Sequence, residues 1–377
     1  VLEINSKTGL YPLYVTYSIF RSRCAASSEE ELDDAKLQQL WDAAVRENVF
    51  VICKTPMAKQ ITRRTLAGYR NIAVNAHYFD DLINMMKNKP RQFVDRILKP
   101  SYWKQEGVKT MKFDAVVGNP PYQITDGSGG SNDAPIYQYF VESAQQLSPN
   151  YVSLIIPSRW FTTGRENLLG DFRRNMLTNR KIANLFVYTN SRDIFPTVEI
   201  KGGLCYFLLD EKHSDDCMYT LIHDGKRDVC MRKLDEFDVL IREPQLATIV
   251  KKVMDRTAET VDSIVSNDTP FGIPTNPFSS GKKSVRIFEE SNDDHNTLLY
   301  YIEKQVRKVA YVQKSDITKN SSDIDKCKVF IPEAAGSGND PYVVGKPEYA
   351  PQNSICSQTF LYVPFNDESE AKNFISY

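Results

Sequence analysis

One short turn carries the residues whose chemistry is most specific in this sequence. Asn119, Pro120, Pro121 and Tyr122 follow directly after the apolar run from Phe113 to Val117. Adjacent prolines fix the backbone and remove two amide donors, so the carbonyl of Pro120 can be held outward as a free acceptor. Together with the side-chain oxygen of Asn119, it can bind both hydrogens of one amine.

This pair of acceptors suits the methylation of a planar amine, whose delocalised lone pair makes it a poor nucleophile. Binding both N–H groups favours a pyramidal nitrogen, so positioning and hydrogen bonding rather than a general base would supply most of the rate. The ring of Tyr122 can stack on a base that has left its duplex, a contact worth roughly 1–3 kcal/mol. The alternative interpretation is a strand-terminating turn with a packed tyrosine.

The elements around the turn have the pattern of a doubly wound α/β domain. From residue 1 to about 210, short apolar runs alternate with helical patterns, which is typical of a mostly parallel sheet flanked by helices. Ligands bind such sheets at the carboxyl ends of the strands, where the turn stands. We expect a Rossmann-like domain over residues 1–212 with a mostly parallel, seven-stranded sheet, formed by Val1–Ile4, Val49–Cys53, Asn71–Asn75, Phe113–Val117, Tyr151–Ile156, Ile182–Tyr188 and Leu204–Leu209.

The composition and the patterning of the sequence change after His213. Turn residues cluster, charges become denser, and short strands such as Ser284–Phe288 and Phe360–Pro364 are separated by loops. A helical pattern persists locally from Pro244 to Thr257. The sequence therefore predicts a second, α+β domain over residues 213–377.

Composition excludes several classes of protein. The 377 residues are 41% hydrophobic and 25% charged with a formal net charge of −1, so a globally basic nucleic-acid binder is excluded and DNA contact would need local basic patches. The seven cysteines form no CxxC pair and only four histidines accompany them, so we expect buried thiols and no metal site. Without an apolar run of roughly 20 residues or a leader pattern, we expect a cytoplasmic protein that does not enter membranes.

The two ends of the chain suggest a piece of a longer polypeptide. Val1 is not a start methionine and opens directly on a strand, whereas the helical pattern from Glu368 to Tyr377 is interrupted by the end of the chain. We expect the first domain to lack its N-terminal part and the second to be truncated at its C-terminus.

The turn and its context resemble the gamma group of adenine-N6 DNA methyltransferases, in particular the methylase and recognition chains of type IIG restriction-modification systems. Asn119 to Tyr122 matches the catalytic motif of that group. Ile194-Phe195-Pro196 looks like the family motif whose aromatic residue closes over the other face of the extruded adenine, so the resemblance implies that Phe195 opposes Tyr122.

The resemblance also implies a cofactor, S-adenosylmethionine. Glu3, followed by Thr8 and Gly9, stands where the family has an acid before a glycine-rich turn, although only one glycine is present here. For the adenine ring of the cofactor the family uses an acid after the third strand, and Asp80 is our choice among the registers available between Asn75 and Asp81.

The region after residue 213 resembles the target-recognition domain of the same family and implies double-stranded DNA as the partner. The basic pair Lys282 and Lys283, flanked by Gly281 and Ser284, suits a loop that contacts phosphates. Nuclease or helicase domains of the same longer polypeptide are further expected partners.

Two alternatives remain open from the sequence. The same turn serves enzymes that methylate a protein glutamine amide or a guanine amine in RNA, but those generally lack a large C-terminal domain. The chain could instead be a DNA-binding specificity module that has lost cofactor affinity, because Gly9 is the single glycine of the cofactor turn.

Overall fold

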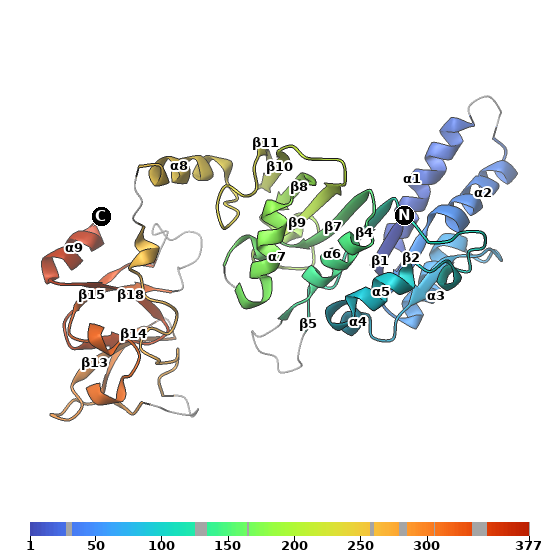
Figure 1. Cartoon of the computed structure of the whole chain (residues 1–377). Helices are drawn as coiled ribbons and strands as arrows, with labels where there is room; N and C mark the ends of the chain where they lie inside the picture. The colour runs from blue at the N-terminus through green and yellow to red at the C-terminus, as the bar shows by residue number, and fades with distance from the viewer. Residues whose placement is uncertain are drawn as a thin grey trace. The chain divides into compact units, whose positions relative to one another are not determined.

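The computed structural model describes residues 1–27, 32–124, 134–163, 166–256, 260–278, 285–304, 306–333 and 345–376. The chain forms two compact units, Val1–Val250 and Lys251–Tyr377 (Figure 1). Each unit has its own hydrophobic core.

A nine-stranded sheet with the order β11-β10-β8-β9-β7-β4-β1-β2-β3 forms the centre of the first unit. Strands β1 to β4 and β7 are parallel to their neighbours, as is β10 to β8, whereas β9 runs antiparallel to both β7 and β8. The strands of this sheet are β1 (Leu2–Ser6), β2 (Phe50–Cys53), β3 (Asn75–Tyr78), β4 (Ala115–Gly118), β7 (Tyr151–Pro157), β8 (Ile182–Tyr188), β9 (Leu204–Asp210), β10 (Cys217–His223) and β11 (Lys226–Arg232).

The mostly parallel α/β sheet expected from the sequence is confirmed. Six of the seven expected strands overlap observed strands over most of their length, whereas the third was expected at Asn71–Asn75 and lies at Asn75–Tyr78, so the two share only Asn75. Two further strands, β10 and β11, extend the sheet beyond β8. A two-stranded ribbon, β5 (Gln123–Ile124) with β6 (Ala134–Pro135), follows β4.

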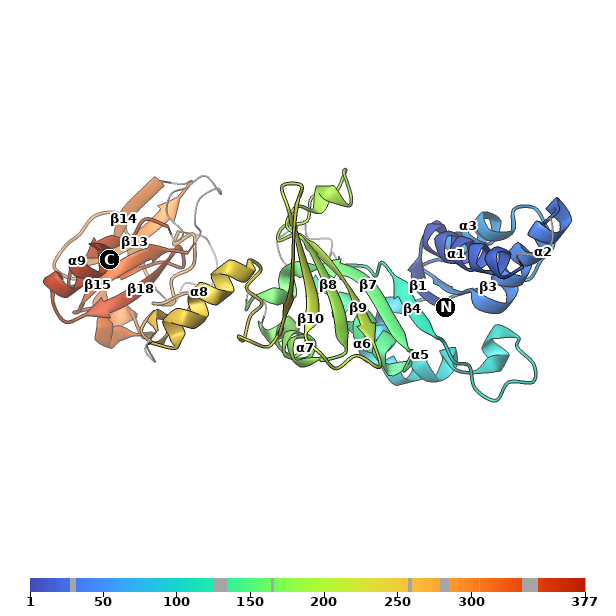
Figure 2. The ribbon, with the colours of Figure 1, turned by 90° about the horizontal axis from the view of Figure 1, so that it is seen from above.

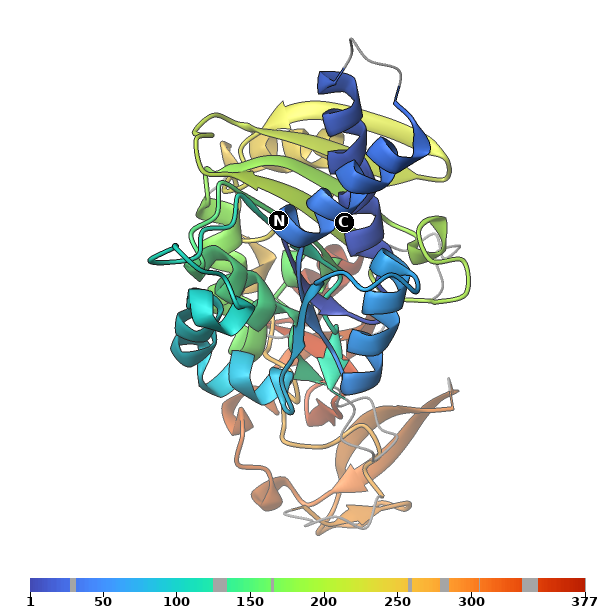
Figure 3. The same cartoon turned by 90° about the vertical axis from the view of Figure 1, so that its right-hand side faces the viewer.

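Helices cover both faces of the sheet because successive strand residues point to opposite sides. Val51 and Cys53 of β2 pack with apolar residues of the α1 and α3 side, whereas Phe50 and Ile52 join the larger core on the other face. Figure 3 shows the blue helices on one side of the blue strands and the teal helices on the other. The helices of this unit are α1 (Leu10–Ala26), α2 (Asp34–Ala43), η1 (Ala44–Asn48), α3 (Pro56–Ala67), α4 (Leu82–Asn88), α5 (Pro90–Ile97), η2 (Pro100–Trp103), α6 (Tyr137–Gln146), η3 (Ser158–Phe161), α7 (Glu166–Thr178) and η4 (Ser191–Asp193).

Local sequence signals fix where several of these helices begin. Pro56 opens α3, and the Thr55 hydroxyl caps it by accepting a hydrogen bond from the Ala58 amide at 3.1 Å. Asp33 caps α2 in the same way through the amide of Lys36. Helix α1 instead follows Gly9, which adopts a left-handed conformation with φ of 78°.

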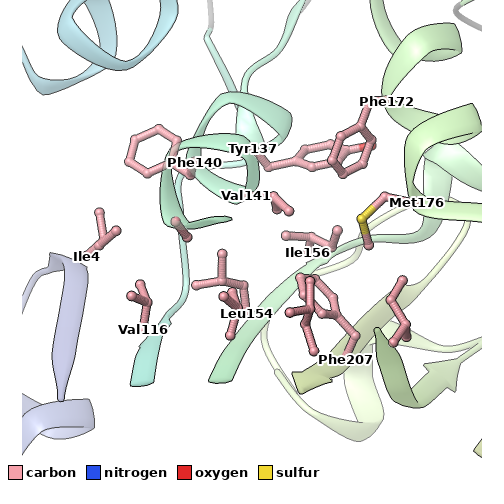
Figure 4. Close-up of a cluster of buried hydrophobic side chains, with 14 of the residues drawn as sticks. Ile4, Val116, Tyr137, Phe140, Val141, Leu154, Ile156, Phe172, Met176 and Phe207 are labelled. Atoms are coloured by element: carbon pink, nitrogen blue, oxygen red, sulfur yellow. The ribbon is translucent and has the colours of Figure 1, made fainter. Parts of the chain in front are cut away.

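The larger core lies between the sheet and helices α6 and α7, which Figure 2 shows beside strands β7 to β10. Side chains of the strands interdigitate with aromatic residues of the two helices, as in the close-up of Figure 4. Burial of large apolar side chains is the main stabilising contribution here, at roughly 1.5–3 kcal/mol each. The labelled members of this cluster are Ile4, Val116, Tyr137, Phe140, Val141, Leu154, Ile156, Phe172, Met176 and Phe207.

The division between the units differs from the boundary expected at 212/213. Strand β10 pairs in parallel with β8, and β11 pairs with β10, so residues 217–232 belong to the first sheet. Leu234 and Leu240 also pack into the core of the first unit. The structure therefore places the division after Val250, within helix α8 (Pro244–Met254).

The second unit contains two small sheets and a C-terminal helix. The four-stranded sheet has the order β12-β14-β13-β17, and the three-stranded sheet has the order β16-β15-β18. Helix α9 packs against the smaller sheet. The elements are η5 (Val261–Ser263), β12 (Ile287–Phe288), β13 (Thr297–Glu303), β14 (Val306–Val312), η6 (Lys314–Asp316), η7 (Ser321–Asp323), β15 (Cys327–Pro332), β16 (Glu348–Ala350), β17 (Ser354–Cys356), β18 (Phe360–Phe365) and α9 (Glu368–Ser376).

Across the part of the chain that the structure describes, no helix has the length and apolar character needed to cross a lipid bilayer.

Candidate active site

The order of the strands identifies one edge of the large sheet as the place for ligands. From β1 the chain proceeds outward through β2 and β3, and then continues on the other side of β1 with β4 and β7. Ligands of doubly wound sheets bind at such a reversal, beyond the carboxyl ends of the strands. Because β1 and β4 are parallel neighbours, the segments that follow them, Lys7 to Gly9 and Asn119 to Tyr122, emerge at this edge.

The turn after β4 is held against β1 by two backbone features. Gly118 has a φ of 153°, and an added Cβ would lie 2.7 Å from the carbonyl oxygen of Ile4, so only glycine permits this approach. Asn5 occupies an irregularity in the β1–β2 pairing, with a φ of 78°, and its side-chain amide donates to the carbonyl of Asn119 at 3.0 Å. The turn from Asn119 to Tyr122 is therefore fixed against β1.

Tyr122 follows the two prolines and is half-buried. Its carbonyl accepts a hydrogen bond from the amide of Ile136 at 3.1 Å, which closes the ribbon of β5 and β6. Its hydroxyl is buried, and it lies close enough to the side chain of Asn119 to interact with it. Burial therefore raises the pKa of Tyr122 far above its ordinary value, and the residue stays an uncharged aromatic surface.

Glu3 is a buried acid within β1, 4% exposed, and it pairs in register with Val117 of β4. Among the described residues no group hydrogen-bonds its Oε2 atom. Desolvation raises the pKa of Glu3 to about 8, and a hydrogen bond from Ser6 opposes that rise. A buried carboxyl oxygen without a hydrogen-bond partner is costly, so a cationic or hydrogen-bonding group beside Oε2 would be favourable.

Gly9 lies between β1 and α1 and is buried against α3. An added Cβ at Gly9 would lie 3.0 Å from the Cα of Thr62, and the hydroxyl of Thr65 donates to the carbonyl of Thr8 at 2.9 Å. No side chain caps α1. Its first amides therefore stand at the same edge as Glu3, where a helix N-terminus favours a negatively charged group.

Tyr11, at the start of α1, is partly buried with 40% of its surface exposed, and the sequence analysis did not single it out. Burial is the main cause of the raised pKa of Tyr11, and the nearby carboxyl of Glu3 adds to it. Tyr11 in turn contributes to the raised pKa of Tyr122. The phenol of Tyr11 therefore lies within electrostatic reach of both.

Asp80 follows β3 and is exposed. Its neighbour Asp81 accepts a hydrogen bond from the amide of Asn84 at 3.0 Å and caps α4. The carboxylate of Asp81 is thus committed to the helix cap, which keeps Asp80 as the acid proposed for a ligand at this edge.

Phe195 lies in the loop between β8 and β9 and is half-buried. Strand β8 runs antiparallel to β9, as does β7, so β8 ends at the same edge as β4 and β7. In the sheet order β7 and β9 separate β4 from β8, which puts the two strand axes roughly 14 Å apart by the usual spacing of strands. Tyr122 and Phe195 thus stand on one edge with β7 and β9 between them.

The remaining site predictions concern phosphate contacts and metals. Lys282 and Lys283 lie outside the residues that the structure describes. Within the described ranges no three His, Cys, Asp or Glu side chains are grouped so that they could hold a metal ion.

The doubly wound sheet and the Asn-Pro-Pro-Tyr turn at its reversal point define the class of the first unit as a methyltransferase-type domain. Comparison with known proteins makes this specific. Residues 47–195 match the family described as Eco57I restriction-modification methylase, and this segment extends from η1 to Phe195. Asn119, Tyr122 and Phe195 lie inside the range that is similar to this family, and Glu3 and Gly9 lie before it.

A curated relative from Mycoplasma pneumoniae (strain ATCC 29342 / M129 / Subtype 1), described as an uncharacterized adenine-specific methylase, is 36% identical over 143 residues. The match covers 35% of this chain and 34% of the relative, so the chain spans about a third of the length of the relative it matches.

Among solved structures, the type IIL restriction-modification enzyme MmeI, determined in complex with DNA, is similar to nearly the whole chain. The similarity has a TM-score of 0.55 at 10% sequence identity and covers 97% of this chain and 57% of that one. At this identity the match concerns the fold alone, and it includes residues of both units.

Proposed function

We propose that this chain is the methyltransferase and target-recognition part of a DNA methyltransferase that transfers the methyl group of S-adenosylmethionine to the N6 amine of adenine in double-stranded DNA. The observation that carries the proposal is the Asn119–Tyr122 turn at the reversal point of the sheet, held by Gly118 and Asn5. The match of residues 47–195 to the restriction-modification methylases supports it.

The residues of the turn have distinct parts in this proposal. The side-chain oxygen of Asn119 and the carbonyl of Pro120 accept the two amine hydrogens, and Pro121 keeps the backbone from donating in competition. The nitrogen would attack the methyl carbon, so that the N–C bond forms while the carbon–sulfur bond breaks and its electron pair stays on the sulfur. One of the two amine protons would then pass to water. Fixed acceptors orient the lone pair without reorganisation, which is where positioned dipoles accelerate a reaction most.

The extruded base needs a replacement for the stacking that it loses in the duplex. Tyr122 offers a neutral ring, and Phe195 of the opposite loop covers the second face. The axes of β4 and β8 are roughly 14 Å apart, so the β8–β9 loop has to extend over β7 and β9 to bring the ring of Phe195 to stacking distance. The position of that loop therefore matters for catalysis.

The residues after β1 fit the methionine part of the cofactor. When bound, S-adenosylmethionine supplies a methyl group activated by a positively charged sulfur, and it also carries an ammonium and a carboxylate. The free oxygen of Glu3 suits a cationic group, and the uncapped amides of α1 after Gly9 suit the carboxylate. Thr8 completes the turn and Asp80 would bind the adenosine end.

Methyl transfer with the whole chain tests the proposal. Plasmid DNA is incubated with the chain and S-adenosylmethionine labelled in the methyl group, and the DNA is digested to nucleosides. We expect label in N6-methyladenine, and the Asn119→Ala variant should lower the rate by about 100-fold or more, since a fixed acceptor in the transition state is lost. Asn88→Ala, a change of an exposed asparagine at the end of α4, is the matched control.

Three results would overturn the proposal. The first is an absence of label in DNA when the cofactor is shown by calorimetry to bind, which would favour a specificity module without transfer activity. The second is label in cytosine, in RNA or in protein instead of adenine. The third is an Asn119→Ala variant as active as the original.

A further inference from the structure

The loop from Thr189 to Gly203, which carries Phe195, is cross-linked internally. The buried hydroxyl of Ser191 donates to the carbonyl of Val198 at 2.9 Å and accepts from the amide of Ile200 at 2.8 Å. The carbonyl of Ser191 also accepts from the amide of Phe195 at 2.9 Å. The tip of the loop therefore has an internal structure fixed by its own hydrogen bonds. Its orientation depends on the residues that join it to β8 and β9.

The joint at the β9 end consists of two glycines in left-handed conformations. Gly202 has a φ of 88° and Gly203 a φ of 78°, and a Cβ on Gly203 would lie 2.1 Å from the carbonyl oxygen of Tyr188. Glycines lose more conformational freedom on folding than any other residue, so this joint needs external contacts to hold one orientation. The amide of Ser158 provides one by donating to the carbonyl of Gly203 at 3.1 Å.

A second contact to the joint comes from the segment 233–243, which we call the strap and which connects β11 to α8. The Nη2 atom of Arg242 donates to the carbonyl of Gly202 at 2.5 Å. The guanidinium of Arg242 lies 5.6 Å from the centre of the Phe161 ring, in the η3 turn after β7. One side chain thus contacts the loop that follows β7 and the end of the loop that follows β8.

The strap itself is bound firmly to the first unit. The amide of Leu240 donates to the carbonyl of Phe161 at 2.9 Å, and the Leu240 side chain is only 3% exposed. The buried Arg173 donates to the carbonyls of Asp238 at 2.9 Å and Thr162 at 3.0 Å. The backbone beside Arg242 is held too, because Arg232 donates to the carbonyl of Ile241 at 2.8 Å.

We propose that Arg242 is a positioning residue that fixes the orientation of the Phe195 loop, so that closing this loop over an extruded base depends on the strap. The inference rests on the proposed function for its catalytic part only. The hydrogen bond from Arg242 to Gly202 is charge-assisted, and such bonds are stronger than those between neutral groups. It acts at the two glycines, which would otherwise allow the loop many orientations. The strap leads within two residues to α8, so the chain that enters the second unit also secures this loop.

Hydrogen–deuterium exchange of the whole chain tests the structural part without any substrate. In Arg242→Ala we expect exchange of peptides covering 189–203 to rise by about tenfold or more, because a hydrogen bond to a charged group is lost. Exchange in β10 and β11, residues 217–232, should stay within about twofold of the original. Arg242→Lys keeps a cationic donor for Gly202 and should restore part of the protection.

Arg180→Ala is the matched control, because Arg180 pairs with Asp235 of the same strap at 3.0 Å but does not contact the Phe195 loop. We expect it to leave exchange of residues 189–203 unchanged. If Arg242→Ala leaves that exchange unchanged as well, or raises exchange equally throughout the first unit, the positioning role is overturned.

The catalytic part is tested on a duplex that contains a methylated site mapped with the original chain. We expect Arg242→Ala to lower kcat by about tenfold with little change in KM for DNA or cofactor. A mismatch opposite the target adenine should restore most of the lost rate, because extruding the base then costs less free energy. Equal loss on matched and mismatched DNA would overturn this part. If the original chain methylates no DNA at all, the proposed function fails, while the exchange comparison still decides whether Arg242 positions the loop.

Discussion

Replacing Glu3 with glutamine separates the cost of burying this carboxyl group from its proposed use. Raising the pKa of Glu3 from 4.5 to about 8 makes its ionised form less favourable in the folded state. At about 1.4 kcal/mol for each pH unit, this amounts to about 4–5 kcal/mol once the group is ionised in both states. Because Glu3 is only 4% exposed, solvent screens little of this cost.

The sign of the effect follows from proton binding. The folded chain binds the Glu3 proton more tightly than the unfolded chain, so the free energy of unfolding falls as the pH rises from 4.5 to about 8. Glutamine has the same shape and does not ionise. We therefore expect Glu3→Gln to stabilise the first unit, by about 3 kcal/mol more at about pH 8.5 than at about pH 5.5.

Thermal unfolding at the two pH values measures this difference. For a unit of this size, about 3 kcal/mol corresponds to a change of roughly 6–12 °C in Tm. Glu106→Gln, a change of an exposed acid in the same unit, is the control and should show no such difference. Equal pH dependence in Glu3→Gln and the original chain would refute the assignment of this cost to Glu3.

The same variant tests the cofactor site. If Glu3 pairs with a cationic group of S-adenosylmethionine, binding below about pH 8 must release its proton, so the affinity of the original chain rises with pH up to that value. Calorimetry in buffers of different ionisation enthalpy measures the released proton. Glu3→Gln should bind more weakly and without proton release, and a variant that binds as tightly as the original would refute a role for Glu3 in the cofactor site.

Two further predictions concern Tyr122 and Lys328. Tyr122→Phe removes the buried hydroxyl beside Asn119 but keeps the ring, so it should keep most of the methyl transfer. Tyr122→Ala also removes the stacking surface and should lose about tenfold or more in transfer rate. Equal losses in the two variants would contradict stacking. In the second unit, the fully buried Lys328 donates to the carbonyls of Asp323, Ile324 and Lys326, and burial lowers the pKa of Lys328 from 10.5 to about 8. The unfolded chain then binds the Lys328 proton more tightly, so the free energy of unfolding measured in urea should rise between pH 8 and 10.5. Lys328→Met should abolish this rise. A rise that persists in the variant would contradict its assignment to Lys328.

The sequence predicted the part of the fold that depends on local apolar patterning. Strands β2, β4, β7, β8 and β9 are buried on both faces or nearly so, and their largely apolar runs identify them, whereas β1 also contains Glu3, Asn5 and Ser6. Strand β11 is different, because its residues from Lys226 to Val229 are exposed and mostly charged. Without knowledge of the strand pairing, such a pattern is typical of a loop. The domain boundary was therefore expected too early, since β10 and β11 reveal their place only through pairing with β8.

For the site, the sequence predicted the rigid turn and its position after β4, because two prolines after an apolar run have few conformations available. It did not predict Asn5, whose part depends on a register shift between β1 and β2, although asparagine is one of the few residues that accept a positive φ. Tyr11 and Arg242 were missed for a related reason. Arg242 donates to the carbonyl of Gly202, which is 40 residues earlier, and Tyr11 lies near Tyr122, which stands on another element. No local spacing in the sequence encodes such contacts.

The attachment of the strap to the first unit also bears on how recognition units could be exchanged between related enzymes. A chimera joined at 212/213 would remove β10 and β11 from the nine-stranded sheet and take with them every contact that Arg242 makes. A chimera joined within α8, after residue 243, would keep the whole strap with its native loops (Figure 1). The junction that preserves the first unit and its strap thus lies at the start of a helix, about two turns before the point where the two units divide.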